Sequence, residues 1–189
     1  MQPFAIVALV LIFARAIAEL WLSRLNQRHV RAHANELPPA IRGIIDEATY
    51  RRSVDYTLAK SRFADITGIF DVVVLIALLF SAVLPSAFER FTASFGTSIW
   101  AMAGFLFFIG TALSMLALPF DWYMQFKLEE RFGFNTATIK TWMLDRVKGF
   151  LLALLIGYPV LALVLKIIEW TGANWWLWAA GIVVAFQLL

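Results

Sequence analysis

Five long apolar runs constrain the fold of this chain more than any other feature of its sequence. They lie near Pro3–Leu22, Ile66–Phe88, Ser98–Phe120, Gly149–Ile168 and Asn174–Leu189. A helix needs about 20 predominantly apolar residues to cross the hydrocarbon core of a bilayer, and its internal hydrogen bonds satisfy the backbone there. The runs therefore predict an all-α fold, a polytopic membrane bundle of five transmembrane helices.

Composition indicates the same class. Of the 189 residues, 61% are hydrophobic and 15% are charged, whereas a soluble domain is roughly 45–50% apolar. The first run has no basic segment before it and no small-residue cleavage pattern after it, so we interpret it as a retained span. The chain has no cysteine, which leaves no disulfide framework and no thiolate metal site.

We interpret residues 1–189 as a single N-terminal transmembrane domain. The last run ends at Leu189 with no aromatic or basic anchor behind it, as a helix would if it were cut part-way through the membrane. We therefore expect this segment to belong to a longer protein.

Lysine and arginine gather in two of the connecting segments. Residues 23–65 and 121–148 carry most of them, whereas residues 89–97 and 169–173 hold only Arg90. The positive-inside rule then predicts that both basic loops are cytoplasmic and that the N-terminus faces the periplasm or lumen. The net charge of +3 fits the anionic headgroups of the cytoplasmic leaflet and does not indicate a nucleic-acid surface.

The first basic loop is predicted to contain helices of its own. Leu37-Pro38-Pro39 favours a helix start. Apolar residues at helical spacing follow: Ile41, Ile44, Ile45 and Ala48. This pattern predicts a cytoplasmic or interfacial amphipathic helix. Residues 54–63 are predicted to run as helix into the second span.

A polar cassette, defined as residues 128–138, separates the third and fourth runs. Glu129 and Glu130 are expected near a helix C-terminus, where backbone dipoles disfavour carboxylates, so a group outside the segment should compensate. Gly133 can adopt the left-handed conformation that ends a helix, and Asn135 is a suitable N-cap for the next helix. We therefore expect a helix–glycine–helix corner at the membrane surface.

Five polar residues elsewhere are further candidates. His29 and His33 share one helix face, like half of a zinc site, but the residue after the first histidine is valine where a metalloprotease has glutamate, so we interpret both as solvated. Arg15 and Glu19 lie one turn apart and can pair along the first span, whereas Asp71 has no partner within its own span. These three either make structural polar contacts inside the bundle or line a hydrated cavity.

The cassette resembles a known family signature. Glu129-Glu130-Arg131-Phe132-Gly133-Phe134-Asn135, with Thr138 after it, is similar to the Glu-Glu-x-x-Gly-Phe-Asn-x-x-Thr pattern of the type I CAAX prenyl proteases, which are multi-span zinc metallopeptidases. Other matching residues extend the resemblance over essentially the whole chain: Leu118-Pro119-Phe120, Asp145, Lys148, Glu47, Tyr56 and Lys60. Thr136-Ala137 departs from the Lys-Gln or Lys-Met that is usual there.

The resemblance implies a block of five membrane helices in front of a cytoplasmic peptidase domain that bears His-Glu-x-x-His, with the helices around a water-filled chamber. This chain has no His-Glu-x-x-His, so we expect no catalytic residue, metal ligand or cofactor in it, and zinc belongs to the presumed full-length protein. Its expected partners are the lipid bilayer, the C-terminal peptidase domain and a prenylated or membrane peptide substrate. Docking would use the corner residues Glu129, Glu130, Gly133, Phe134, Asn135 and Thr138.

Other interpretations of the same residues stay open. Glu129 and Glu130 could simply pair with Lys127, Arg131 or Arg146. The chain as a whole could be a small multi-pass transporter or channel, or a structural membrane scaffold. A transporter would use an intramembrane charge as a relay, but the sequence shows no inverted repeat. A scaffold would not need the unusual residues of the cassette.

Overall fold

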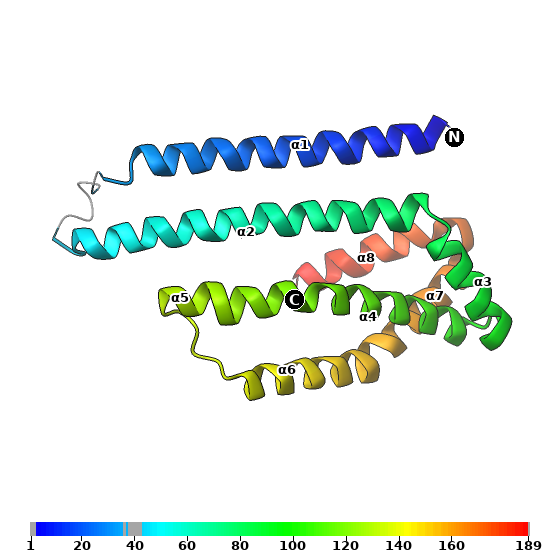
Figure 1. Cartoon of the computed structure of the whole chain (residues 1–189). Helices are drawn as coiled ribbons and strands as arrows, with labels where there is room; N and C mark the ends of the chain where they lie inside the picture. Colours follow the sequence, from blue (N-terminus) through cyan, green and yellow to red (C-terminus); the bar gives the residue numbers. More distant parts are fainter. Residues whose placement is uncertain (1–2, 36, 38–42, 189) are drawn as a thin grey trace. The chain divides into compact units, whose positions relative to one another are not determined.

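The computed structural model describes residues 3–35, 37 and 43–188, and this part of the chain is almost entirely helical (Figure 1). Four helical stretches in it are long and apolar enough to cross a membrane: Pro3–Ala32, Glu47–Phe80, Ile99–Phe132 and Ile139–Trp178. The predicted fifth span corresponds to the last helix, α8 (Trp175–Leu188). The all-α membrane fold predicted from the apolar runs is confirmed.

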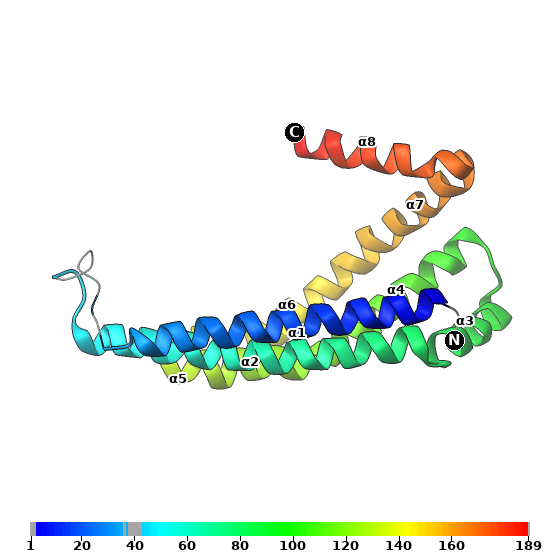
Figure 2. The same cartoon turned by 90° about the horizontal axis from the view of Figure 1, so that it is seen from above.

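The chain forms two compact units. Unit 1 comprises residues 1–84 and 119–136, and unit 2 comprises residues 85–118 and 137–189. In unit 1, α1 (Pro3–Ala32) and α2 (Glu47–Phe80) run antiparallel and side by side (Figures 1 and 2). The end of α4 (Ile99–Tyr123) continues through η2 (Met124–Glu129) and α5 (Glu130–Phe132) along α2. This arrangement places the polar cassette beside the start of α2.

The first basic loop does not form the predicted amphipathic helix where the structure describes it. Residues 38–42, which hold the predicted helix start, lie outside the described residues. Gly43 has a φ of 85°, and residues 44–46 are not helical. A left-handed glycine breaks the helical repeat that the apolar spacing suggested.

A capping carboxylate fixes the start of α2 instead. The Asp46 carboxylate accepts a hydrogen bond of 2.7 Å from the backbone N–H of Thr49, one of the donors that a helix start leaves unpaired. Hydrogen bonds from the side chain and then the backbone of Thr49 lower the pKa of Asp46. From Glu47 onward the helix is continuous to Phe80, so the prediction that residues 54–63 run as helix into the second span is confirmed.

The second helix ends at Phe80, before the predicted boundary at Phe88. The Ser81 backbone N–H and hydroxyl both donate to the carbonyl of Ala77, and the Ser81 backbone is extended, with ψ of 171°. The same hydroxyl accepts a hydrogen bond of 3.2 Å from the backbone N–H of Val83. A serine that supplies local partners to the backbone ends one helix and begins α3 (Val83–Phe95).

Unit 2 contains most of α3, the first part of α4 and five elements that follow the cassette. These elements are α6 (Ile139–Leu152), the π-helix η3 (Ala153–Gly157), α7 (Tyr158–Thr171), the 3₁₀ turn η4 (Gly172–Asn174) and α8. The ring of Phe105 packs edge-on against Phe88 and Phe91, with centroids 5.2 and 5.5 Å apart. The Tyr158 hydroxyl donates to the carbonyl of Trp100 at 3.1 Å. Aromatic contacts therefore join α3 and α7 to α4.

Large apolar side chains lie on the surface of the described residues. Phe4 is 82% exposed, Leu155 is 71% exposed and Trp170 is 79% exposed. In water, such a surface would be unfavourable by about 25 cal/mol for each Å² of apolar area. Lipid tails remove that cost, and membrane helices then associate through packing and polar contacts. Together with the apolar helices, this surface identifies an integral membrane protein.

Candidate functional site

The helix that carries Glu129 and Glu130 ends in a Schellman motif. Gly133 is left-handed, with a φ of 78°. Its N–H donates to the carbonyl of Glu130 at 3.0 Å, and the N–H of Phe134 donates to the carbonyl of Glu129 at 2.9 Å. This pair of bonds satisfies two carbonyls that a helix end leaves without partners. The prediction that Gly133 ends the helix is confirmed.

The two carboxylates therefore occupy the last turn of a helix, where the backbone dipole opposes them. Glu129 is half-buried and Glu130 is exposed, and neither forms an ion pair within the described residues. The neighbouring cations turn to aromatic rings instead: Lys127 Nζ lies 5.8 Å from the ring centroid of Trp122, and the Arg131 guanidinium lies 5.6 Å from that of Phe132. The alternative of local pairing with these neighbours receives no support.

Two side chains of α2, Arg52 and Tyr56, contact the corner and form what we call the clamp. The ring of Tyr56 contacts the rings of both Phe132 and Phe134, with centroid distances of 5.3 and 4.7 Å. Arg52 donates a hydrogen bond of 2.9 Å from Nη2 to the carbonyl of Phe132. A cation at the C-terminal end of a helix is favourable, so this guanidinium offsets the unfavourable position of the two carboxylates. Arg52 is the compensating group that the cassette led us to expect.

Asn135 does not cap the helix after the corner, contrary to the prediction. Its Oδ1 accepts a hydrogen bond of 2.7 Å from Nε2 of Gln125. The N-cap of α6 is Thr138, whose hydroxyl accepts from the backbone N–H of Thr141 at 3.2 Å. Either residue type can cap a helix, and the contact with Gln125 draws Asn135 back toward the preceding helix.

The helix before the corner is a π-helix from Met124 to Glu129. Such segments are rare and are frequent at functional sites. Phe126 and Leu128 are buried within this segment, and Pro119 lies inside the preceding helix. The π-helix therefore sets the faces on which Gln125, two buried apolar side chains and Glu129 lie.

A buried polar network between α1 and α2 was missed by the sequence analysis. Gln27, only 7% exposed, donates from Nε2 to Oδ2 of Asp65 at 2.8 Å, and its Nε2 lies 3.1 Å from the hydroxyls of Ser23 and Ser61. Arg31 donates to Oε1 of Gln27 at 3.4 Å. The available signal was a pair of polar residues four apart on each helix, Ser23 with Gln27 and Ser61 with Asp65. Polar contacts of this kind fix the register of membrane helices.

The remaining predicted polar residues lie apart from the corner. Arg15 Nε and Glu19 Oε1 form an ion pair of 2.8 Å on an exposed face of α1, which confirms the predicted pairing along the helix. Asp71 is exposed on α2 and has no ion pair within the described residues.

The histidine pair offers no complete metal site. His29 and His33 have ring centroids 4.3 Å apart, and Nδ1 of His33 lies 2.9 Å from the carbonyl of His29. The described residues contain no group of three His, Cys, Asp or Glu side chains placed to hold a metal ion. We therefore assign no zinc ligand to them.

The helices and their apolar surface define a multi-span membrane domain with polar contacts at a helix–glycine corner and between α1 and α2. Residues 26–189 match the family described as CAAX prenyl protease N-terminal, five membrane helices. The chain belongs to this family, and the resemblance seen in the cassette is confirmed.

Individual relatives agree with this assignment. The chain is 30% identical over 158 residues to CAAX prenyl protease 1 of Saccharomyces cerevisiae, which covers 76% of this chain and 34% of the relative. It is 27% identical over 189 residues to a CAAX prenyl protease 1 homolog of Taenia solium, covering 90% and 40%. The crystal structure of S. mikatae Ste24p has the same fold, with a TM-score of 0.86 and 24% identity over 100% of this chain and 44% of that chain. The chain thus spans less than half the length of these relatives.

Proposed function

We propose that this chain is the non-catalytic membrane domain of a zinc-dependent CAAX prenyl endopeptidase. In this proposal it forms part of the wall of an intramembrane chamber and docks a cytoplasmic peptidase domain that cleaves C-terminal prenylated or membrane-associated peptides. Two observations support it: membership of the family, and relatives named as proteases that are more than twice as long as the matched segment.

The observation that carries the docking role is the state of Glu129 and Glu130. Both carboxylates lack an ion pair among the described residues, although their position at a helix end is unfavourable. The backbone beneath them is held by the Schellman bonds and by Arg52. Carboxylates that stand on a fixed backbone and form no ion pair among the described residues are suited to basic side chains of a second domain, because charge-assisted hydrogen bonds are about twice as strong as neutral ones.

The chemistry would reside outside this chain. A zinc ion in such an enzyme polarises the scissile carbonyl and activates water, and the described residues supply no set of ligands for it. This chain would contribute a fixed corner against which the peptidase domain is positioned. It would also contribute a membrane-embedded wall from which a prenylated or membrane-associated peptide is presented.

We further propose that Asp71, Arg15 and Glu19 line the hydrated chamber. Charged groups inside a bilayer are costly unless they are paired or reach water. Arg15 and Glu19 form their own ion pair, whereas Asp71 is exposed on α2. A water-filled chamber on that face of α2 would hydrate the Asp71 carboxylate.

The docking role is tested in the full-length protein with Glu129→Gln and Glu130→Gln, singly and together. The substitutions keep the shape of the side chains and remove their charge. We expect cleavage of a prenylated Cys-a-a-X peptide to fall by roughly tenfold or more in the double variant, because hydrogen bonds to charged groups are lost. Thermal unfolding of the detergent-solubilised protein should stay unchanged.

Glu89→Gln serves as the matched control, because Glu89 is an exposed glutamate on α3 outside the corner. Its activity should equal that of the unmodified protein. Full activity in the double variant, with unchanged unfolding, would contradict docking through these carboxylates. A loss of activity that accompanies a lower unfolding temperature would instead assign them a structural role.

A further inference from the structure

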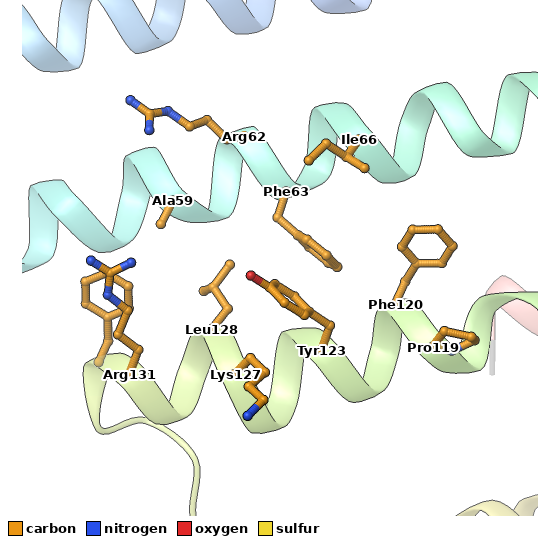
Figure 3. Close-up of a pocket in the computed structure, with 11 residues that line it drawn as sticks. Ala59, Arg62, Phe63, Ile66, Pro119, Phe120, Tyr123, Lys127, Leu128 and Arg131 are labelled. Carbon is orange, nitrogen blue, oxygen red and sulfur yellow. The ribbon is translucent and has the colours of Figure 1, made fainter.

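A pocket of about 520 Å³ lies in unit 1 between α2 and the continuous helix formed by α4, η2 and α5. Its walls are aromatic and aliphatic. The rings of Phe63 and Tyr123 stack between the two helices with centroids 5.3 Å apart (Figure 3). The ring centroid of Phe120 lies 6.3 Å from that of Phe63. Ile66 adds an aliphatic surface from α2. The interior therefore suits a hydrocarbon chain.

Cations line the same pocket. Arg62, Lys127 and Arg131 all border it, and none of the three forms an ion pair within the described residues. Figure 3 shows the Arg131 side chain reaching toward α2, whereas Lys127 points away from α2 and Arg62 points away from η2. Of the three cations, Arg131 is thus the one that faces α2, and the other two add positive charge at the margins of the pocket.

The rings of Phe120 and Tyr123 and the side chain of Arg131 lie at different levels along the helix axis. Phe120 lies at one end and Arg131 at the other, a distance of about 16 Å at 1.5 Å per residue. Residues before Phe120 belong to the apolar stretch of α4, and residues after Tyr123 belong to the basic segment. We therefore expect the pocket to extend from the level of the lipid tails to the level of the headgroups.

We propose that this pocket binds a single anionic phospholipid drawn from the surrounding bilayer. An acyl chain would lie against Phe63, Phe120 and Tyr123, and the phosphate would sit beside Arg131. A free phosphate ion would leave the aromatic wall empty, and a zwitterionic lipid would leave the positive charge uncompensated. Basic pockets between membrane helices on the cytoplasmic side are suited to such headgroups.

The proposal is tested by native mass spectrometry of the full-length protein, released from nanodiscs made of phosphatidylglycerol and phosphatidylcholine. We expect one phosphatidylglycerol to remain bound and phosphatidylcholine to dissociate. Arg131→Gln should weaken retention roughly fivefold, and the double variant with Lys127→Gln about thirtyfold, because each basic side chain near the headgroups contributes separately. Arg131→Lys should retain most of the binding.

Two controls separate the pocket from general charge. Lys140→Gln removes a cation on α6, outside the pocket, and should leave lipid retention unchanged. Ala59→Phe should fill the pocket from the side of α2 and abolish lipid retention, although every cation is still present. Ala64→Phe, on the same helix but outside the pocket lining, should leave lipid retention unchanged. Thermal unfolding identifies any variant that fails to fold.

Three results would overturn the proposal. Equal retention of phosphatidylglycerol and phosphatidylcholine would remove the headgroup preference, and equal loss in Arg131→Gln and Lys140→Gln would show that only net charge matters. Displacement of phosphatidylglycerol by a prenylated peptide, with pocket variants that lose the peptide alone, would assign the pocket to a substrate.

Discussion

Gly133 determines where the chain turns at the corner, because its φ of 78° is a conformation that residues with a side chain rarely adopt. The neighbouring residues depend on it: the bonds from Gly133 and Phe134 to the preceding carbonyls form only with this backbone. The position of the two carboxylates is therefore set by a residue that carries no side chain.

Gly133→Ala is expected to lower the free energy of unfolding by about 1–2 kcal/mol, because a Cβ in the left-handed region meets the following carbonyl. The added Cβ would also lie 3.3 Å from Nη2 of Arg52, the atom that donates to the carbonyl of Phe132, and would therefore disturb this hydrogen bond. Thermal unfolding in detergent measures the change. Gly149→Ala is the control: it lies within α6, with nothing within 4 Å of an added Cβ, and should stabilise by about 0.5–1 kcal/mol. Equal effects at both positions would contradict this account.

At the scale of elements, the contact between α2 and α5 depends on the rings of Tyr56, Phe132 and Phe134. These rings and the Arg52 hydrogen bond lie at the start of α2, where the Asp46 cap fixes the first turn. At the other end of the same interface, the ring centroids of Phe70 and Phe120 lie 4.7 Å apart. Aromatic contacts therefore bracket the pocket along α2.

Tyr56→Ala is expected to destabilise the protein by about 1–3 kcal/mol, because two aromatic pairs are lost and each contributes about 0.5–1.5 kcal/mol beyond its buried area. Tyr56→Phe keeps both rings in contact and should be nearly neutral, since the hydroxyl has only a long contact of 3.5 Å with Lys60 Nζ. Limited proteolysis at residues 133–138, together with thermal unfolding, measures the effect. A large loss in Tyr56→Phe would mean that the hydroxyl, and not the ring, holds the clamp.

Much of this architecture could be predicted from the sequence, and the misses have physical reasons. A lone glycine after a charged helical segment indicates a helix end, so the Gly133 corner was predictable. Asn135 and Thr138 are both good caps, and the choice between them depends on Gln125, which reaches Asn135 through a π-helix that has no local sequence signal. The Gln27 network could not be predicted, because it depends on the register between α1 and α2, and that register is fixed only by tertiary packing.

At the scale of the whole molecule, the distribution of basic residues predicts the orientation in the membrane. The two basic segments, residues 23–65 and 121–148, should face the cytoplasm, and residues 89–97 the opposite side. Because these 189 residues contain no cysteine, single cysteines can report the topology once any cysteine outside them is replaced by serine.

We expect Thr97→Cys to react with a membrane-impermeant maleimide in intact cells, and Ala34→Cys and Lys140→Cys to react only after the membrane is permeabilised. The reason is the cost of moving clusters of Lys and Arg across the bilayer during insertion. Gel-shift labelling with a large maleimide reads out each position. Labelling of Lys140→Cys in intact cells, with Thr97→Cys protected, would reverse the proposed orientation.

The π-helix from Met124 to Glu129 also predicts where the chain can lose a residue without a change in the packing of its helices. Because each i→i+5 bond encloses one residue more than an α-helical bond, the segment accommodates an additional residue while the flanking helices keep their faces. Deleting Gln125 should convert the segment to regular α-helix and leave Phe132 near Tyr56, at the loss of the contact with Asn135. The same deletion within α2 would turn every later residue by about 100°. A one-residue deletion should therefore be tolerated within η2 and should not be tolerated within α2.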